Sequence, residues 1–391
     1  MTMRLSLIAG CALLAACSPG GGNTKQQADM TTGAAVQGKP FSFPASATAP
    51  FTVTRYGSFD NPFSLTFLPD GSALVTEKPG ALKWWHPDGS VADVAGVPKV
   101  AYGGQGGLLD IALAPDFATS RTVYLTYAEP RPNGRSLALA KATLPQGGKP
   151  VLSDLNVIWR AGSDGDGGQF GGVIAFAPDG RTLFLSTGER MRKTPAQDPD
   201  QAIGKIIHLT LDGKPAPDNP MVAQGGMRAD IWTLGHRNPY GLAFDKAGNL
   251  WEIEMGPKGG DELNLILKGK NYGWPVVSNG DNYDGSPIPD HDTHPQFEAP
   301  KLWWNPSISP AGLVIYSGRD FPQWDGSALM GALSGQALVR VALNGTQAAK
   351  ADRWDMGARI RDVAQAPDGS IWLLQDGDDA GMLKLTPKQK P

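Results

Sequence analysis

The sequence predicts an all-β fold, a six-bladed β-propeller, from three observations. A short sequence motif recurs six times along the chain. It consists of an apolar run, a turn resembling Ala-Pro-Asp-Gly, and a second apolar run. Each copy has the pattern of a β-hairpin, in which a tight turn joins two strands. The copies are spaced by roughly 45 to 70 residues, and a hairpin cannot bury its faces alone, so the copies must pack side by side. A closed ring of six such units is a propeller, which displays its functional loops at one end of a central channel.

The repeated motif is clear in four copies and weaker in two. Each copy is followed by a second strand-like run, for example 73–76 after the first copy and 182–186 after the third. The clear copies are 65–71, 111–116, 174–180 and 363–369, and the weaker ones are 242–248 and 313–318.

Length and composition agree with one large ring. The 391 residues could hold two or three domains by length alone, but the repeat favours a single ring. The 50 Gly and 33 Pro residues suit a turn-rich β protein, and charged residues make up only 19% of the chain. The net charge of −3 argues against a non-specific nucleic-acid surface, so no nucleic-acid partner is expected.

The first residues have the pattern of a secretion signal. Arg4 is followed by an almost continuous apolar run from 5 to 16, which is too short to cross a bilayer as a helix. The run ends in Leu-Ala-Ala before Cys17 and resembles a bacterial lipobox. We therefore expect 1–16 to be a lipoprotein signal peptide and Cys17 to be lipidated; an ordinary signal peptide with an incidental cysteine is the alternative.

The interpretation of 1–16 as a lipoprotein signal peptide predicts a lipid-anchored protein of the cell envelope or periplasm. Ser18 after the cysteine would favour the outer membrane in a Gram-negative cell. The second cysteine, Cys11, lies inside the signal, so the mature chain would have no disulfide. Residues 17–50 are rich in Gly, Thr, Gln, Ala, Ser and Pro and predict a flexible tether. The propeller is expected to span 51–391.

The densest polar motifs lie between residues 231 and 285. Four Gly-rich loops there carry Arg, Glu, Asn or Tyr between apolar runs, and such loops on a rigid ring are typical of functional sites. A tight turn would explain any one of them alone, but four together favour a site. They span 235–241, 254–264, 271–275 and 281–285.

Three of these motifs resemble those of the soluble quinoprotein glucose/sorbosone dehydrogenases, which include the bacterial aldose sugar dehydrogenases. They are Gly-His-Arg-Asn-Pro at 235–239, Gly-Pro-Lys-Gly-Gly-Asp-Glu-Leu-Asn at 256–264 and Asn-Tyr-Gly-Trp-Pro at 271–275. Residues 103–109 and 359–363 match the same family, and the resemblance covers about 50–386. It implies a six-bladed propeller that binds pyrroloquinoline quinone (PQQ) and Ca²⁺ and oxidises aldoses at the anomeric carbon.

The resemblance also implies a set of cofactor contacts. The quinone carries three carboxylates, and a guanidinium can pair with a carboxylate through two parallel hydrogen bonds. Arg359 and Arg361 are two apart on a predicted strand and so face the same way; ion pairs on an outer face are the alternative. The residues that match quinone-binding positions are Gln105, Arg237, Asn238, Tyr283, Arg359 and Arg361.

Two calcium sites are implied by the same resemblance. The carbonyls of Gly256 and Pro257 match ligands of the Ca²⁺ that touches the quinone. Glu262 and the carbonyl of Tyr272 match a second, structural site. Backbone carbonyls are suitable ligands because Ca²⁺ prefers hard oxygen donors. The sequence has no dense Asp-x-Asp calcium loop, so residue spacing alone does not predict calcium.

The chain departs from the family pattern at the catalytic base. Gln169 stands where the family has the His that takes the proton from the anomeric hydroxyl, and Val173 stands in place of an Arg. An amide cannot accept a proton at neutral pH, and loss of a positioned base costs about 10²–10⁴-fold in rate. Met255 and Ser334 also replace polar residues that are usual in the family.

Other residues are candidates for the base. His236 is expected to be structural, and His208, in an apolar run, is expected to be a packed side chain. His291 and His294 are expected on a solvated surface loop, and Glu189 in a surface ion pair with a nearby arginine. Burial of Glu189 would instead raise its pKa toward a useful range.

Three functions are therefore considered. The leading one is a PQQ-dependent aldose dehydrogenase with a modified base, which passes electrons from a small sugar substrate to an envelope acceptor. The second is a catalytically silent quinone- or sugar-binding lipoprotein, for which Gln169 is the motive. The third is a Ca²⁺-dependent sugar lactonase, for which only Glu262 is a firm carboxylate ligand. The protein is expected to be a monomer or a dimer.

Overall fold

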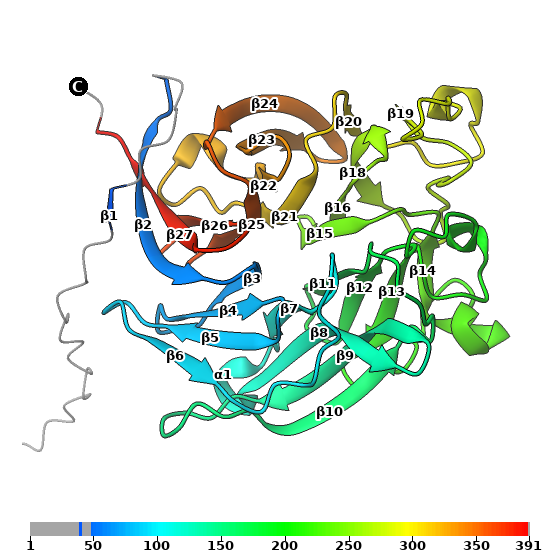
Figure 1. Ribbon diagram of the computed structural model, residues 1–391. Helices are drawn as coiled ribbons and strands as arrows, with labels where there is room; N and C mark the ends of the chain where they lie inside the picture. Colours follow the sequence, from blue (N-terminus) through cyan, green and yellow to red (C-terminus); the bar gives the residue numbers. More distant parts are fainter. Residues whose placement is uncertain (1–38, 41–47, 390–391) are drawn as a thin grey trace, which may run out of the picture. The chain divides into compact units, whose positions relative to one another are not determined.

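Apolar runs and Asp-Gly turns form six antiparallel sheets in the computed structural model, which describes residues 39–40 and 48–389 (Figure 1). The inner strands of successive sheets pack against one another, and the last packs against the first, so the sheets close into a ring. The structure is therefore the predicted six-bladed β-propeller. The predicted signal peptide, Cys17 and most of the predicted tether lie outside the described residues.

Each blade is given from its inner to its outer strand. The first is β3 (Pro62–Phe67), β4 (Ala73–Glu77), β5 (Ala81–Trp85) and β6 (Val91–Val94). The second is β7 (Leu108–Leu113), β8 (Thr122–Arg131), β9 (Gly134–Thr143) and β10 (Ser153–Arg160). The third is β11 (Gly171–Phe176), β12 (Thr182–Thr187), β13 (Lys205–Thr210) and β14 (Ile231–Leu234).

The remaining blades follow the same plan. The fourth is β15 (Pro239–Phe244), β16 (Leu250–Glu254), β18 (Asp261–Ile266) and β20 (Leu302–Trp304). The fifth is β21 (Pro310–Ile315), β22 (Ala328–Ala332), β23 (Ala337–Asn344) and β24 (Gln347–Asp355). The sixth is β25 (Ile360–Gln365), β26 (Ile371–Gln375), β27 (Ala380–Pro387), β2 (Phe51–Phe59) and β1 (Lys39–Pro40).

Short elements occupy the connections. A two-stranded ribbon pairs β17 (Lys258–Gly259) with β19 (Gly280–Asp281). The helical turns are α1 (Phe117–Ser120), η1 (Thr194–Gln197), η2 (Val222–Gln224), η3 (Gly226–Asp230), η4 (His291–Thr293) and η5 (Pro322–Trp324). In the part of the chain that the structure describes, no helix has the length and apolar character to cross a bilayer.

All six copies of the repeated motif coincide with inner strands and the turns that follow them. In the first turn, Asp70 Oδ1 accepts a hydrogen bond from the Ser72 amide at 2.9 Å, and Asp368 does the same for Ser370 at 2.9 Å. An Asp side chain that bonds to the backbone two residues on favours a tight turn. The glycine after it takes a positive φ, +82° at Gly71, which other residues rarely adopt.

The ring is closed by a strand from the N-terminal side of the domain. β2 pairs antiparallel with β27, with Phe51 opposite Pro387 and Arg55 opposite Leu383. The sixth blade therefore contains strands from both ends of the propeller (Figure 1). Phe51 is 1% exposed and fixes this strand in the core.

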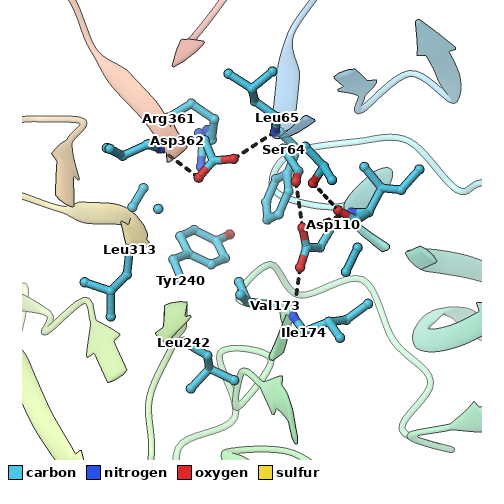
Figure 2. Close-up of a pocket in the computed structure, with 17 residues that line it drawn as sticks. Ser64, Leu65, Asp110, Val173, Ile174, Tyr240, Leu242, Leu313, Arg361 and Asp362 are labelled. Carbon is cyan, nitrogen blue, oxygen red and sulfur yellow. Dashed lines mark hydrogen bonds between the residues drawn. The ribbon is translucent and has the colours of Figure 1, made fainter. Parts of the chain in front are cut away.

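The inner strands surround a central cavity of about 170 Å³ (Figure 2). Two carboxylates in it connect successive blades. Asp110 on β7 accepts hydrogen bonds from Ser64 Oγ on β3 at 2.6 Å and from the Ile174 amide on β11 at 2.8 Å. Asp362 on β25 accepts the Leu65 amide of β3 at 2.8 Å. These bonds link four neighbouring blades at the channel.

Burial gives one of these carboxylates an unusual pKa. Desolvation raises the pKa of Asp362 from 3.8 to about 7, and the charge of Asp110 adds to the increase, whereas two backbone amides and Arg361 oppose it. Between these two pH values the unfolded chain is ionised at this position while the folded chain is protonated. The folded state then binds more protons, so stability falls as pH rises.

We expect the unfolding free energy of the wild type to decrease between pH 4 and pH 7, relative to Asp362→Asn. The limiting slope for one group is about 1.4 kcal/mol per pH unit. Urea unfolding at a series of pH values measures both proteins, and the variant lacks the titrating group. Parallel stability curves for the two proteins would contradict this expectation.

Candidate active site

A cavity of about 370 Å³ opens among loops at one end of the ring. The segments around 169, 189–193, 237 and 257 precede inner strands or follow second strands of the blades, which places them at the same end of the channel. Residues 274–286 reach this end through the pairing of β19 with β17 and through the Trp274 amide, which donates to the Gly235 carbonyl at 2.9 Å. The cavity is lined by Gln169, Glu189, Met191, Lys193, Arg237, Pro257, Trp274, Asn282, Tyr283, Asp284 and Ser286. Four residues predicted from the sequence therefore share one cavity: Gln169, Arg237, Pro257 and Tyr283.

Arg237 connects the loops around this cavity. One terminal nitrogen donates to the carbonyls of Met255 at 2.9 Å and Gly256 at 2.8 Å. The other donates to the Tyr283 hydroxyl at 3.1 Å. The guanidinium carbon also lies 5.3 Å from the centre of the Trp274 ring. Arg237 is only 5% exposed, so its charge is held in a partly desolvated position beside the cavity.

Arg359 and Arg361 meet at one acidic residue, Asp376. Arg361 donates two hydrogen bonds to Asp376 Oδ1, at 2.9 and 2.7 Å, and Arg359 Nε donates to Oδ2 at 2.8 Å. Burial opposes ionisation of Asp376, but the two guanidinium groups outweigh it and hold its pKa below the ordinary value. The two arginines face the same way, as their spacing predicts.

Tyr240 lies close to Arg361 and Gln105. The Arg361 guanidinium carbon is 5.8 Å from its ring centre, and its hydroxyl is 3.5 Å from Gln105 Oε1. Burial raises the pKa of Tyr240, whereas Arg361, Asn238 and Arg237 all act to lower it. Arg361 also lines the central channel. Arg237 and Arg361 therefore both lie close enough to Tyr240 to influence it, and Arg359 is joined to Arg361 through Asp376.

Gln105 and Gln169 are held by backbone hydrogen bonds. Gln105 Oε1 accepts the Gln169 amide at 2.5 Å. Gln169 Oε1 accepts the Met191 amide at 3.1 Å, so the oxygen of this side chain is engaged and its NH₂ group is a hydrogen-bond donor. Gln169 lines the cavity but offers no proton acceptor to it.

Two residues that line the cavity, Arg237 and Trp274, and the neighbouring Asn238 have buried polar atoms without partners in the part of the chain that the structure describes. Among the described residues, no hydrogen bond reaches Arg237 Nε, Asn238 Oδ1 or Trp274 Nε1. Such orphaned groups are rare in folded proteins unless a ligand or water satisfies them. Two donors and one acceptor beside a cationic side chain suit a polar, anionic ligand, and PQQ fits this description.

A second, very small cavity of about 10 Å³ lies behind Arg237. It is lined by residues that include Gly256, Glu262 and Tyr272, three of the four predicted calcium ligands. Backbone carbonyls converge there, because a Cβ added to Gly256 would lie 2.2 Å from the Gly259 oxygen and 2.5 Å from the Gly260 oxygen. A space of this size holds about one water or ion. The hard oxygen donors around it fit Ca²⁺.

His291 is buried beside this small cavity. It is 5% exposed, and its Nε2 is 3.3 Å from Glu262 Oε1. The prediction of a solvated surface position for His291 is therefore wrong, because η4 folds back against the fourth blade. Burial raises the pKa of Glu262, and His291 and Asn264 oppose the increase.

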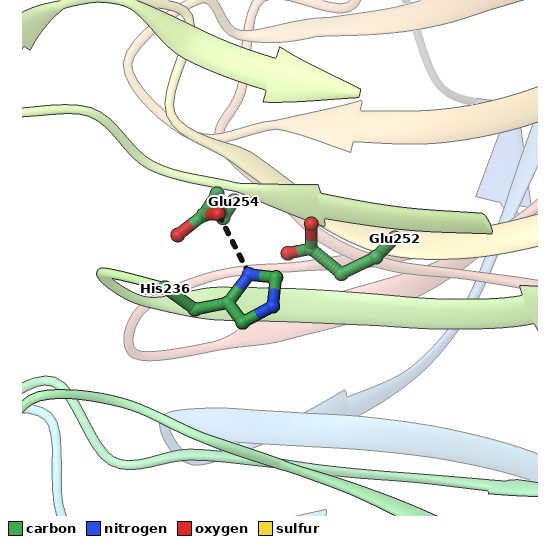
Figure 3. A group of neighbouring side chains, drawn as sticks. All are labelled: His236, Glu252 and Glu254. Carbon is green, nitrogen blue, oxygen red and sulfur yellow. Dashed lines mark hydrogen bonds and ion pairs between the residues drawn. The ribbon is translucent and has the colours of Figure 1, made fainter. Parts of the chain in front are cut away.

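His236, Glu252 and Glu254 form a buried cluster whose polar atoms lie within 4.8 Å of one another (Figure 3). Both ring nitrogens of His236 already have partners, Glu254 Oε1 at 3.0 Å and Thr233 Oγ1 at 2.9 Å. A histidine so engaged has no lone pair for a metal, so the cluster is a hydrogen-bonding network. This agrees with the structural role expected for His236.

Glu254 fixes the loop that carries Arg237. Its Oε2 accepts the amides of Arg237 at 2.5 Å and Asn238 at 3.2 Å. Neighbouring Glu252 is completely buried, and burial together with the charge of Glu254 raises its pKa well above the ordinary value. Neither glutamate was singled out from the sequence. The alternation of the two in Glu-Ile-Glu could have shown that both face one side of a strand.

Two other candidate bases have clear positions. His208 stacks on Phe184 with 4.0 Å between ring centres, which is the packed position that the sequence predicts. Glu189 is only 2% exposed and lines the larger cavity. The prediction of a surface ion pair for Glu189 is therefore wrong.

Comparisons with known proteins agree with this geometry. The model of the glucose/sorbosone dehydrogenase family matches residues 59–384. The aldose sugar dehydrogenase YliI of Escherichia coli is 39% identical over 337 residues, which cover 84% of this chain and 91% of that protein. The quinoprotein glucose dehydrogenase B of Acinetobacter calcoaceticus is 26% identical over 82% of this chain and 84% of that protein.

A solved structure shows the same likeness. The PQQ-bound aldose sugar dehydrogenase of Streptomyces coelicolor superposes with a TM-score of 0.71 at 30% identity, covering 89% of this chain and all of that one. The chain belongs to the glucose/sorbosone dehydrogenase family.

Proposed function

We propose that this protein is a PQQ- and Ca²⁺-dependent dehydrogenase that oxidises an aldose or related sugar at the anomeric carbon. The observation that carries the proposal is the 370 Å³ cavity, which Gln169, Arg237, Pro257 and Tyr283 line together and beside which the charge of Arg237 is buried. Unpartnered polar atoms of Arg237, Asn238 and Trp274 support a polar ligand at this position. Family membership and the PQQ-bound relative support the choice of quinone.

Each site residue has a role in this proposal. The arginines would hold the carboxylates of the quinone, and Gln105, Asn238 and Tyr283 would provide hydrogen bonds to it. The carbonyls of Gly256 and Pro257 would bind the Ca²⁺ next to the quinone, and Glu262 and the Tyr272 carbonyl would bind the second ion. The bound quinone supplies a two-electron acceptor for the hydride of the sugar.

The remaining polar cavity suits a sugar. Lys193 donates to Asn282 Oδ1 at 2.9 Å, and Tyr283, 70% exposed, presents an aromatic face at the rim. These groups, with Asp284 and Ser286, offer hydrogen bonds to hydroxyl groups. The electrons would pass on to an acceptor in the cell envelope, where the lipobox-like sequence before Cys17 suggests an anchor.

One observation favours a second candidate, the catalytically silent quinone or sugar binder. The Gln169 side chain presents a donor and no proton acceptor to the cavity, because its oxygen accepts the Met191 amide. Turnover of the wild type distinguishes the two candidates.

The test is a titration of metal-depleted protein with PQQ, with and without Ca²⁺, followed by absorbance. We expect saturable uptake at micromolar quinone that depends on Ca²⁺, and then dye reduction with some members of an aldose panel. Arg237→Gln is expected to weaken uptake by about 30-fold or more, because removing one partner of a buried charged pair costs at least about 2 kcal/mol.

Arg340→Gln is the matched control. Arg340 is a partly buried arginine that pairs with Asp352 in the fifth blade and does not line the cavity, so its variant is expected to bind quinone like the wild type. Failure of the wild type to take up quinone at micromolar concentration would exclude the proposed function. Hydrolysis of sugar lactones without quinone would favour the lactonase instead.

A further inference from the structure

The cavity needs a proton acceptor that Gln169 does not supply. Oxidation of an anomeric C–OH group releases a hydride from carbon and a proton from oxygen, and a positioned base for the proton accounts for about 10²–10⁴-fold in rate. Among the residues that line the cavity in the described part of the chain there is no histidine. Two carboxylates line it, Glu189 and Asp284.

The two carboxylates differ in their surroundings. Asp284 is exposed at the rim, and hydrogen bonds from Ser286 lower its pKa, which makes it a weak base. Glu189 is 2% exposed. Burial is the largest influence on Glu189 and raises its pKa, whereas the Lys193 and Arg192 amides and the charges of Arg237 and Lys193 oppose the increase.

Backbone hydrogen bonds fix Glu189 between the loop that carries Arg237 and the loop that carries Gln169. Its amide donates to the Arg237 carbonyl at 2.9 Å. Its neighbours bind the Gln169 loop, because the Gly188 amide donates to the Phe170 carbonyl at 2.9 Å and the Arg190 amide to the Gln169 carbonyl at 3.2 Å. Glu189 is therefore held between the arginine that would bind quinone and the position of the missing base.

The nearby arginines do not neutralise Glu189 through an ion pair. Arg190 donates instead to backbone carbonyls, including those of Gly165 at 2.9 Å and Gly168 at 3.0 Å, and stacks on Phe170. One Glu189 oxygen, Oε2, accepts the Lys193 amide. No side chain among the described residues forms an ion pair or a hydrogen bond with this carboxylate, so it remains able to accept a proton from a ligand in the cavity.

We propose that Glu189 is the general base of this enzyme and accepts the proton of the anomeric hydroxyl. The inference rests on the proposed function. In the step, the anomeric C–H bond breaks and its electron pair leaves with the hydrogen as hydride to the bound ortho-quinone, which is reduced by two electrons. The O–H bond breaks, its proton forms a bond to Glu189, and the sugar becomes the lactone. The Lys193 amide holds the carboxylate in position during the transfer.

The first experiment compares Glu189→Gln with the wild type. We expect unchanged quinone uptake, measured by absorbance, and a loss of hydride transfer of about 10²–10⁴-fold in single-turnover reduction. The pH profile of kcat/KM in the wild type is expected to rise through a pKa above the ordinary Glu value, and the variant is expected to lack this limb. Infrared titration of both proteins before loading is expected to show one carboxyl with a raised pKa that is absent from the variant.

Glu77→Gln is the matched control. Glu77 is also a buried glutamate that accepts a backbone amide, from Asp60 at 2.8 Å, and burial also raises its pKa. It lies on β4 in the first blade and does not line the cavity. Its variant is expected to retain the full rate of hydride transfer.

Chemical rescue separates a catalytic from a structural role. Glu189→Ala leaves space for a small carboxylate, and added formate is expected to restore hydride transfer by at least about tenfold in a saturable manner. Rescue of this kind requires a missing base and would not repair a misfolded loop. The absence of rescue, with quinone uptake intact, would overturn the proposal.

The outcomes also separate this inference from the proposed function. A Glu189→Gln variant that keeps the wild-type rate would overturn the role of Glu189 and leave the dehydrogenase function standing. Quinone uptake without any turnover in the wild type would overturn Glu189 as a base and support the silent binder. Failure of the wild type to bind quinone would overturn both proposals together.

Discussion

Glu254→Ala is expected to lower the unfolding free energy by about 3–5 kcal/mol, the usual cost of breaking a buried charged network by removing one partner. The substitution leaves the amides of Arg237 and Asn238 without their shared acceptor and His236 without one of its two partners. Urea unfolding followed by tryptophan fluorescence measures the change. Quinone uptake is expected to weaken as well, since the loop that carries Arg237 loses its support.

Two variants serve as controls for this result. Glu254→Gln keeps an acceptor for the two amides and is expected to cost less than the alanine variant. Glu129→Ala removes a glutamate from a partly exposed ion pair with Arg160 and is expected to cost less than about 1 kcal/mol. Equal losses for Glu254→Ala and Glu129→Ala would contradict the role assigned to Glu254.

Phe51→Ala is expected to cost about 3–5 kcal/mol through loss of core contacts at the strand that closes the ring. Phe51 makes edge-to-face contacts with Phe321, Trp324 and Trp354, at 6.4, 6.2 and 5.4 Å between ring centres. These rings belong to the fifth blade and the connections around it, so one side chain joins the closing strand to its neighbour. Thermal and urea unfolding measure the effect.

Thr52→Ala is the control for Phe51→Ala. Thr52 is the next residue on the same strand, points outward and is exposed, so its substitution is expected to change stability by less than about 0.5 kcal/mol. A Phe51→Ala protein as stable as the Thr52→Ala protein would show that the closing strand is not held by this contact.

The fold could be predicted because its signals are local. Most inner strands are followed at once by a turn in which an Asp side chain or a Gly residue favours that geometry, as at Asp70 and Gly71. Even the weak copy at 313–318 coincides with an inner strand and its turn. There, Gly312 lies so close to Asp362 that an added Cβ would be 2.4 Å from Oδ1, so the position requires glycine.

The pairing of β2 with β27 could not be predicted in the same way. It involves opposite ends of the domain, which the periodicity of the sequence cannot indicate.

The site could be predicted only in part, because a sequence motif identifies residues but does not identify their hydrogen-bond and ion-pair partners in the folded chain. Arg237 and Tyr283 were singled out from the sequence, and the structure joins them by a hydrogen bond. Asp376 was missed, although it brings Arg359 and Arg361 together, because it follows a different strand and belongs to no motif.

The two wrong expectations have a common physical cause. His291 and Glu189 lie in polar segments that suggest exposure, yet both are buried. His291 is covered because its loop returns to Glu262, and Glu189 because the backbone on both sides of it binds other loops. Composition describes a segment, whereas burial depends on what the rest of the chain places over it.

The pairing of β2 with β27 also sets the order of events during synthesis. β2 emerges from the ribosome before any blade, but its partner is the last strand to be made, and bringing such distant segments together costs chain entropy. Until translation ends, the sixth sheet lacks a member and its neighbours expose unpaired edges, which are prone to association with other chains.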